Sequence, residues 1–267
     1  MHNKSSSFAK IYLILIFLLL YTPILFLIFY SFNSGGTMGS FKGFTLDWYR
    51  DLFKDMRLFL IVLNTFAIAI LSSLVATIVG IFGALAIHSY KQRKTRNTLL
   101  SLNNVLMVSP DVIIGASFLI LFTIGGIKLG FISVLLSHIA FSIPIVVLLV
   151  LPKLTEMNPT LMDAARDLGA NNWQILTKVI LPYITPGIFA GFFMALTYSL
   201  DDFAVTFFVT GNGFSTLSVE IYSLARRGIS LNINALSAVL FLFTIALVIV
   251  YFLLQQRSNL KTMGVRK

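Results

Sequence analysis

Six apolar runs, each roughly 20 residues or longer, dominate this sequence of 267 residues. The runs cover residues 11–30, 58–88, 104–124, 129–151, 185–209 and 235–254. A bilayer core about 30 Å thick is crossed by roughly 20 residues of α-helix, because a helix satisfies every backbone N–H and C=O group internally. The runs therefore predict an all-α membrane protein with six transmembrane helices, organised as one domain over residues 1–267.

The composition excludes several other classes of protein. Hydrophobic residues make up 57% of the chain and charged residues only 11%, whereas soluble domains are about a quarter charged. Cysteine is absent, which excludes thiol nucleophiles, cysteine metal sites and disulfides. The histidines do not have the spacing of metal ligands, so we predict no metal site and interpret His88 and His138 as packing or interface residues.

The distribution of positive charge predicts the orientation of the chain. The first run lacks a small-residue cleavage site after Tyr30, so we expect a retained helix rather than a signal peptide. With six spans both termini lie on one side, and the larger share of the Lys and Arg residues falls on that side. The loop 91–96 is especially basic. Because such loops stay in the cytoplasm, both termini are predicted to be cytoplasmic.

The segment 153–182 is the longest cytoplasmic stretch in this topology. Its helix-capping and helix-breaking residues predict two short helices joined at Gly169. Asn158 suits an N-cap, with Pro159 at the first helical position. Asn171 or Asn172 would cap the second helix, and Pro182 would end it. Two interpretations stay open: a surface connection, or a docking helix whose apolar stripe inserts into a soluble partner.

The same segment carries a recognisable motif. It contains the pattern Asp163-Ala164-Ala165-x3-Gly169-x9-Val179-x-Leu181-Pro182. This pattern resembles the EAA motif of ABC importer permeases, Glu-Ala-Ala-x3-Gly-x9-Ile-x-Leu-Pro, with conservative changes at two positions. The resemblance implies that the helix 159–169 is a coupling helix seated in a cleft of a cytoplasmic ATPase, with Ala164 and Ala165 permitting close approach and Gly169 forming the bend.

The chain has no G-x-x-x-x-G-K-[ST] phosphate loop, so it cannot be that ATPase. We therefore expect a non-catalytic membrane subunit that binds no cofactor. ATP and Mg²⁺ would be held by a partner ATPase subunit.

Three carboxylates lie within the apolar runs and are the candidate functional residues. Asp201 and Asp202 are placed in the outer third of the fifth run, and Asp111 near the middle of the third. An ionised carboxylate at such depth costs at least about 2.5 kcal/mol, so it should face protein or a water-filled path. Alternatively, Asp201 and Asp202 mark the outer end of a helix, where carboxylates meet headgroups and water, and Asp111 accompanies a kink at Pro110.

The geometry of a helix separates these candidates further. Adjacent helical residues point about 100° apart, so Asp201 and Asp202 cannot both face one lumen. Tyr198 shares a helix face with Asp201. Trp48, in the outer loop before the second run, either lines an entrance or anchors the chain at the membrane interface. Fixed negative charge with aromatic faces nearby suits a cationic substrate.

A wider set of motifs resembles the spermidine/putrescine importer permeases, in particular the second of their two membrane subunits. The matching stretches are Ser109-Pro110-Asp111 with Gly115, Tyr198 to Phe203, Phe208 to Gly211, residues 217–228 and Asn234-Ala235-Leu236. The resemblance implies a type I ABC importer subunit in a bacterial cytoplasmic membrane. Its partners would be a homologous permease, two ATPase subunits and an extracytoplasmic polyamine-binding protein.

By this resemblance Asp201 and Asp111 guide a polyamine cation, and Asp202 and Tyr198 support them. Two alternatives remain: a permease of this family for another small cationic solute, and a secondary transporter driven by ion gradients. A membrane enzyme with Asp111 and Asp201 as a carboxylate dyad is disfavoured by their different predicted depths.

Overall fold

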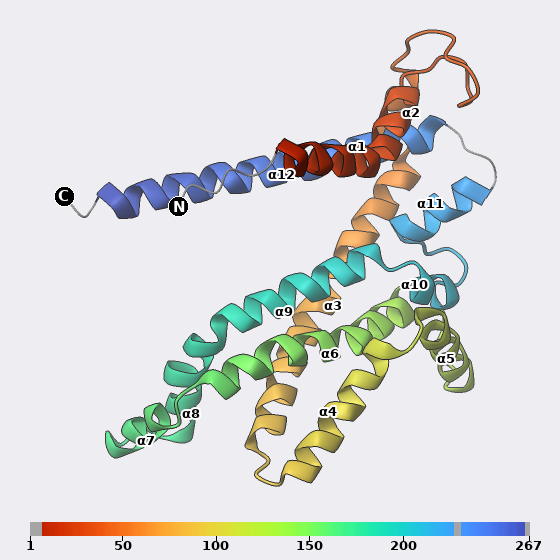
Figure 1. Ribbon diagram of the computed structural model, residues 1–267. Helices are drawn as coiled ribbons and strands as arrows, with labels where there is room; N and C mark the ends of the chain where they lie inside the picture. The colour runs from red at the N-terminus through yellow and green to blue at the C-terminus, as the bar shows by residue number, and fades with distance from the viewer. Residues whose placement is uncertain (1–6, 227–230, 265–267) are drawn as a thin grey trace. The chain divides into compact units, whose positions relative to one another are not determined.

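The computed structural model describes residues 7–226 and 231–264. Within these ranges the regular elements are all helices, and the one isolated bridge joins Asn33 to Phe44. The helices are α1 (Ser7–Tyr30), α2 (Asp47–Lys54), α3 (Met56–Ser89), α4 (Arg93–Val108), α5 (Asp111–Ile124), α6 (Phe131–Glu156), α7 (Thr160–Asp167), α8 (Asn172–Ile175), η1 (Leu176–Ile180), α9 (Leu181–Asp201), α10 (Ala204–Val209), α11 (Leu217–Arg226) and α12 (Leu231–Gly264) (Figure 1). The predicted all-α fold class is confirmed.

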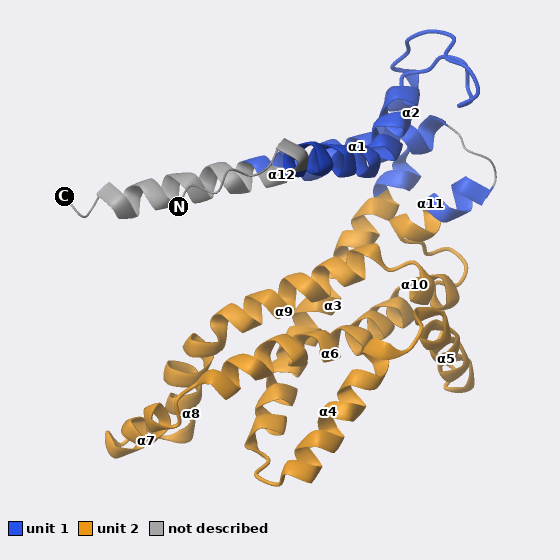
Figure 2. Ribbon diagram, viewed as in Figure 1, with its two compact units in different colours: residues 1–59, 221–267 blue, residues 60–220 orange. Residues whose placement is uncertain are grey.

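The chain forms two compact units (Figure 2). Unit 1 comprises residues 1–59 and 221–267, and unit 2 comprises residues 60–220. In unit 1, α1 packs along α12, where the rings of Tyr21 and Phe241 lie 6.3 Å apart. Unit 2 holds most of the apolar helices and all the candidate site residues except Trp48.

Four helical stretches are long and apolar enough to cross a membrane: Ala9–Tyr30, Met56–Ser89, Phe131–Glu156 and Asn172–Asp201. They coincide with the first, second, fourth and fifth apolar runs. The bent pair α4 and α5 would supply a fifth span, and a shorter apolar helix covers Leu231–Ala246. The count of six spans and the cytoplasmic placement of the termini stay predictions, and residues 1–6 and 265–267 lie outside the described residues.

The third apolar run, expected as one span over 104–124, is not a straight helix. It is divided between α4 and α5, whose axes meet at 101°. Ser109 adopts extended backbone angles before Pro110, as the residue preceding a proline usually does. Pro110 then starts α5, where its carbonyl accepts hydrogen bonds from the N–H groups of Ile113 and Ile114. The proline thus turns the chain rather than kinking a continuous helix.

The fifth run also differs from the expectation at both ends. Pro182 does not end the second short helix, because α8, the π-helical turn η1 and α9 form one helical stretch of 30 residues. Proline lacks an N–H donor, and the wider π turn directly before it accommodates that loss. At the other end α9 stops at Asp201, and the rest of the run forms α10. The second run, by contrast, is one unbroken helix, α3.

The core of unit 2 lies where α3, α6 and α9 approach one another. Val146, Val150 and Leu154 of α6 are buried there with Ile184 of α9. Small residues allow the close approach: a Cβ atom added at Gly187 would lie 2.9 Å from the carbonyl oxygen of Leu149. This packing fixes the direction of α9, whose last turn carries the candidate site.

Candidate functional site

The site lies where the polypeptide breaks between α9 and α10. Asp202 has an extended conformation with ψ 122°, so the chain leaves the helix there and re-enters one at Ala204. The break opens a pocket of about 240 Å³. Its lining residues are Asp111, Tyr198, Asp201, Asp202, Phe203 and Ala204. Of the five predicted path residues, the structure therefore brings four together at one pocket.

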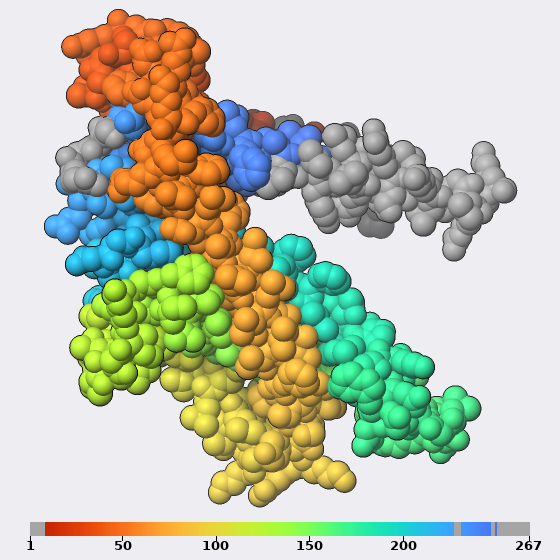
Figure 3. Space-filling view, turned by 180° about the vertical axis from the view of Figure 1, so that it is seen from behind, coloured from red at the N-terminus to blue at the C-terminus, as the bar shows by residue number. Residues whose placement is uncertain are grey.

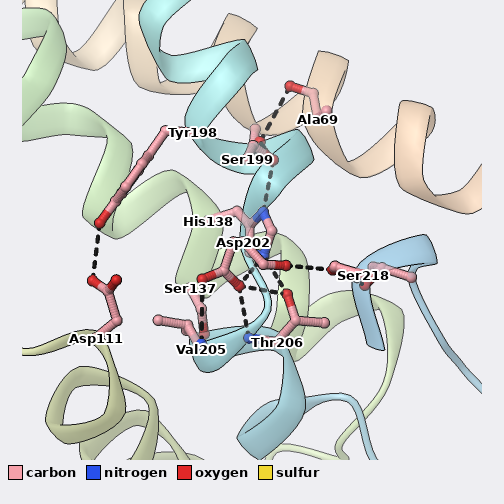
Figure 4. Close-up of polar contacts among 12 residues, drawn as sticks. Ala69, Asp111, Ser137, His138, Tyr198, Ser199, Asp202, Val205, Thr206 and Ser218 are labelled. Atoms are coloured by element: carbon pink, nitrogen blue, oxygen red, sulfur yellow. Dashed lines mark hydrogen bonds and ion pairs between the residues drawn. The ribbon is translucent and has the colours of Figure 1, made fainter. Parts of the chain in front are cut away.

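Two of these residues are joined across the pocket. The hydroxyl of Tyr198 in α9 donates a hydrogen bond of 2.9 Å to the carboxylate of Asp111 at the start of α5 (Figure 4). Both residues are exposed, and Tyr198 retains 37% of its accessible surface. The N-terminus of a helix favours a negative charge, so α5 itself stabilises the Asp111 carboxylate.

The sequence predicted different depths for Asp111 and Asp201, yet both line the same pocket. The 101° bend at Pro110 is the cause, since it brings the first residue of α5 to the end of α9. The predicted difference in depth therefore does not keep the two carboxylates apart in the fold.

Asp201 and Asp202 have different environments, as the geometry of adjacent helical residues requires. Asp201 is exposed. The Asp202 side chain is only 7% exposed, and its carboxylate accepts hydrogen bonds from the backbone N–H groups of Val205 and Thr206 and from the Thr206 hydroxyl. Asp202 therefore lies just after the last residue of α9, and its carboxylate stabilises the first turn of α10.

A histidine that sequence reasoning set aside lies behind Asp202. His138 of α6 is fully buried, and its ring nitrogens lie 2.7 Å from Ser199 Oγ and 2.8 Å from Thr206 Oγ1. Its Nε2 atom is 3.4 Å from the Asp202 carboxylate. The sequence signal was a polar residue inside an apolar run, and only the fold reveals its partners.

Trp48 belongs to unit 1, whereas the other candidate residues belong to unit 2. Its indole N–H donates a hydrogen bond of 2.8 Å to the Asn33 carbonyl, which holds α2 against the preceding loop. The Trp48 side chain is half-buried. Its placement at an entrance to the path stays a prediction.

The residues of the motif form the pair of short helices that the sequence predicted, α7 and α8. Asn158 Oδ1 accepts a hydrogen bond from the Thr160 N–H, and Gly169 ends α7 with φ +80°. The N–H groups of Gly169 and Ala170 bond back to the carbonyls of Arg166 and Ala165, which is a Schellman ending.

The second helix of the motif starts at Asn171. Asn171 and Gln174 bond each other's backbone N–H in a capping box. The motif's Leu181 and Pro182 begin α9, so the motif runs directly into the long helix that ends at the pocket.

Both short helices project from unit 2 at the end of α9 away from the pocket (Figures 1 and 3). None of the residues of α7 is buried, so Ala164 and Ala165 are accessible. Leu168 is 89% exposed and Trp173 is 70% exposed. Asp163 pairs with Arg166 of the same helix at 3.1 Å. An apolar surface of this kind is typical of a docking element.

Within the described residues, no group of three His, Cys, Asp or Glu side chains has a geometry that could hold a metal ion. The site therefore consists of exposed carboxylates, a phenol and a buried polar network. Such an arrangement can attract and orient a cation.

Comparisons with known proteins agree with this description. The family model for the binding-protein-dependent transport system inner membrane component matches residues 76–263. The spermidine/putrescine transport system permease protein PotC of Haemophilus influenzae is 34% identical over 248 residues, covering 93% of this chain and 96% of the relative. PotC of Escherichia coli is 38% identical over 88% of both chains. The putrescine transport system permease protein PotI of Escherichia coli is 31% identical over 88% of this chain and 86% of the relative.

Solved structures with the same fold belong to ABC importers. A bacterial ABC transporter involved in the import of the acidic polysaccharide alginate superposes with a TM-score of 0.70 at 21% identity, covering 92% of each chain. The MetNI methionine ABC transporter superposes with a TM-score of 0.61 at 19% identity, covering 74% of this chain and 95% of the other. At these identities the likeness concerns the fold alone.

Proposed function

Because this chain belongs to the family of binding-protein-dependent transport system inner membrane components, we propose that it is the permease subunit of an ATP-driven importer for polyamines such as spermidine and putrescine. The relatives named as spermidine/putrescine and putrescine permeases support this substrate class. Within the structure, the observation that carries the proposal is the pocket formed by Asp111, Tyr198 and Asp201.

The chemistry of the pocket suits a polyamine. Polyamines present ammonium groups at intervals along methylene chains, so they need negative charge at more than one point. Asp111 and Asp201 supply two exposed carboxylates. Tyr198 adds an aromatic face for a cation–π contact. In the proposed path Asp201 and Asp111 guide the cation, while Asp202 and Tyr198 hold that surface in shape and Trp48 stands at its entrance.

We propose that the helix 159–169 couples this path to ATP hydrolysis on a separate subunit. Asp163, Ala164, Ala165 and Gly169 form the docking turn, and Leu181 and Pro182 join it to the rest of the chain. The exposed Leu168 and Trp173 support docking, since neither side chain is covered within the chain. ATP binding would close the ATPase dimer, move this helix and open the path outward. Hydrolysis would return the path to the cytoplasm.

The proposed assembly contains a second, homologous permease, two cytoplasmic ATPase subunits and an extracytoplasmic polyamine-binding protein. ATP and Mg²⁺ bind to the ATPase subunits and not to this chain. The assembly lies in a bacterial cytoplasmic membrane, which the inner-membrane description of the family supports. The alternative substrate is another small cation, for which the same carboxylates would serve.

Uptake of labelled spermidine and putrescine in cells that lack this chain and other polyamine importers tests the proposal. We expect the intact chain to restore uptake and Asp201→Asn to reduce it at least about tenfold, because the variant removes an exposed charge from the path. Glu156→Gln is the matched control, since Glu156 is also exposed but lies at the last residue of α6, outside the lining of the pocket. No restoration by the intact chain would refute the substrate, and equal uptake by the Asp201→Asn and Glu156→Gln variants would refute the site.

A further inference from the structure

His138 connects three elements of unit 2 at the point where α9 breaks. It projects from α6, while Ser199 belongs to α9 and Thr206 to α10 (Figure 4). The break between α9 and α10 comprises only Asp202 and Phe203. One buried ring therefore contacts the helices on both sides of the break.

The hydrogen-bond donors in this network can be assigned by following the acceptors. An ionised carboxylate only accepts, so the Thr206 hydroxyl donates its proton to Asp202 at 2.7 Å. Thr206 Oγ1 must then accept from His138 Nε2, which fixes the proton on that nitrogen. The Ser72 hydroxyl lies 3.1 Å from Ser199 Oγ and 3.3 Å from the Ala69 carbonyl oxygen, and Ser199 Oγ lies 2.7 Å from His138 Nδ1.

The result is one connected network of hydrogen bonds that runs through the His138 ring. Its members run in the order Ser72, Ser199, His138, Thr206 and Asp202. The network ends on the Asp202 carboxylate, which accepts from the Thr206 hydroxyl. A completely satisfied buried network of this kind specifies one arrangement of the helices that contribute to it.

The histidine also reaches the pocket through ring contacts. Its ring centroid lies 4.9 Å from that of Phe141, and Phe141 in turn meets Tyr198 edge to face at 5.0 Å. Tyr198 is the residue that bonds Asp111 across the pocket. Phe141 therefore lies between His138 of the buried network and Tyr198 of the pocket and contacts both rings.

We propose that His138 is a positioning residue for the substrate pocket: by holding the ends of α9 and α10 it fixes where Asp201 and Tyr198 face Asp111. The inference rests on the proposed function for its transport consequences, but the geometry it describes does not depend on the substrate. Burying a polar ring carries a desolvation cost, which the hydrogen bonds of His138 to Ser199 and Thr206 offset, so the ring is held in one orientation between the two helices.

The first test measures the geometry of the pocket directly. The chain contains no cysteine, so Ala204→Cys places a single thiol in the pocket lining. The rate at which a small cationic methanethiosulfonate reagent modifies this thiol is measured in three assembled transporters. The first carries only Ala204→Cys, and the other two carry in addition either His138→Leu or Thr206→Val. His138→Leu removes both ring hydrogen bonds, and Thr206→Val is an isosteric change that removes the hydroxyl link. We expect the rate to change about fivefold or more in both.

Three matched variants make this test specific. Thr206→Ser keeps the hydroxyl and should leave the rate within about twofold of the intact background. Ser142 lies in α6, the helix that carries His138, and its buried hydroxyl has no hydrogen-bond partner among the described residues. Ser142→Ala should therefore leave the modification rate unchanged. A thiol introduced by Lys128→Cys, outside the pocket lining, should react at the same rate in every background.

The second test is the kinetics of spermidine uptake. Mispositioned carboxylates bind the cation less well, so His138→Leu and Thr206→Val should each raise KM about fivefold with a smaller effect on the maximal rate. The double variant should be no worse than the more affected single variant, since both interrupt one chain. Loss of membrane-inserted protein in His138→Leu would leave Thr206→Val to decide.

Unchanged thiol reactivity in the Thr206→Val and His138→Leu backgrounds would overturn the inference, as would equal effects of Thr206→Val and Thr206→Ser. These outcomes differ from failure of the proposed function. If the thiol rates follow the prediction while the intact chain takes up no polyamine, the positioning role stands and the substrate does not.

Discussion

A carboxylate at the end of a membrane helix is stabilised either by protein hydrogen bonds or by water and cations, and Asp202 and Asp201 represent these two cases. Asp202 obtains its hydrogen bonds from the first turn of α10. Asp201, exposed one residue earlier, has its charge available for a ligand. Removing either carboxylate would therefore have different consequences: loss of a helix cap at Asp202 and loss of a binding charge at Asp201.

The hydrogen bond between Tyr198 and Asp111 can be tested without disturbing the packing of the ring. Tyr198→Phe removes only the hydroxyl that donates to Asp111 at 2.9 Å and leaves the contact with Phe141 in place. Because a hydrogen bond of this kind contributes about 1 kcal/mol, we expect KM for spermidine uptake to rise about fivefold. Tyr183→Phe is the control, since the Tyr183 hydroxyl donates a hydrogen bond of 3.3 Å to the Glu156 carbonyl and not to a residue of the pocket. Similar changes in both variants would count against a role for the Asp111 contact.

Sequence analysis could predict those residues of the site that carry a charge, because ionisable side chains are rare within membrane-spanning segments. Asp111, Asp201 and Asp202 stand out as charges in apolar runs, and Tyr198 follows from helical spacing. The sequence predicted His138 to be a packing or interface residue because it has no partner at the spacing of metal ligands. Its partners in the structure, Ser199 and Thr206, lie 61 and 68 residues further along the chain. A contact of that range has no local signal, so it became visible only in the fold.

At the scale of elements, Pro110 and Pro182 have different effects on the helices that contain or follow them. Pro110 follows an extended residue and starts a new helix at 101° to the previous one. Pro182 follows a π-helical turn and leaves the helix continuous. Local sequence predicts a disturbance at both prolines, whereas the outcome depends on what the flanking helices pack against. The boundaries of the third and fifth runs were therefore wrong, although their helical character was right.

The packing of α6 against α9 is set by glycines, and it can be tested by adding one methyl group. A Cβ atom at Gly187 would lie 2.9 Å from the Leu149 carbonyl oxygen, which belongs to a backbone that cannot easily move. We expect Gly187→Ala to destabilise the protein by about 1–3 kcal/mol, seen as a lower melting temperature in detergent. Gly83→Ala is the matched control. Its Cβ would make an ordinary contact of 3.4 Å with Val147, so alanine should be neutral or stabilising there. A melting temperature for Gly187→Ala at or above that of Gly83→Ala would contradict this account of the packing.

At the scale of the whole molecule, one helical stretch connects the proposed docking turn to the proposed substrate pocket. It starts at Asn172, next to the docking turn, and ends at Asp201 in the pocket. A motion applied to the docking turn by an ATPase would therefore reach the pocket along a single element. The all-α class and the long apolar helices followed from hydropathy alone. The number of spans, which the apolar runs predict, and the orientation of the chain in the membrane, which the charge bias predicts, remain predictions.

The most direct test of the central claim is transport by the purified assembly in proteoliposomes. These would contain this chain, its second permease, the ATPase and the binding protein, with labelled spermidine outside. The account predicts that spermidine accumulates inside only when ATP reaches the ATPase, and that deleting residues 163–169 abolishes both accumulation and binding of the ATPase. Accumulation driven by a proton or sodium gradient without ATP, or undiminished after the deletion, would contradict it.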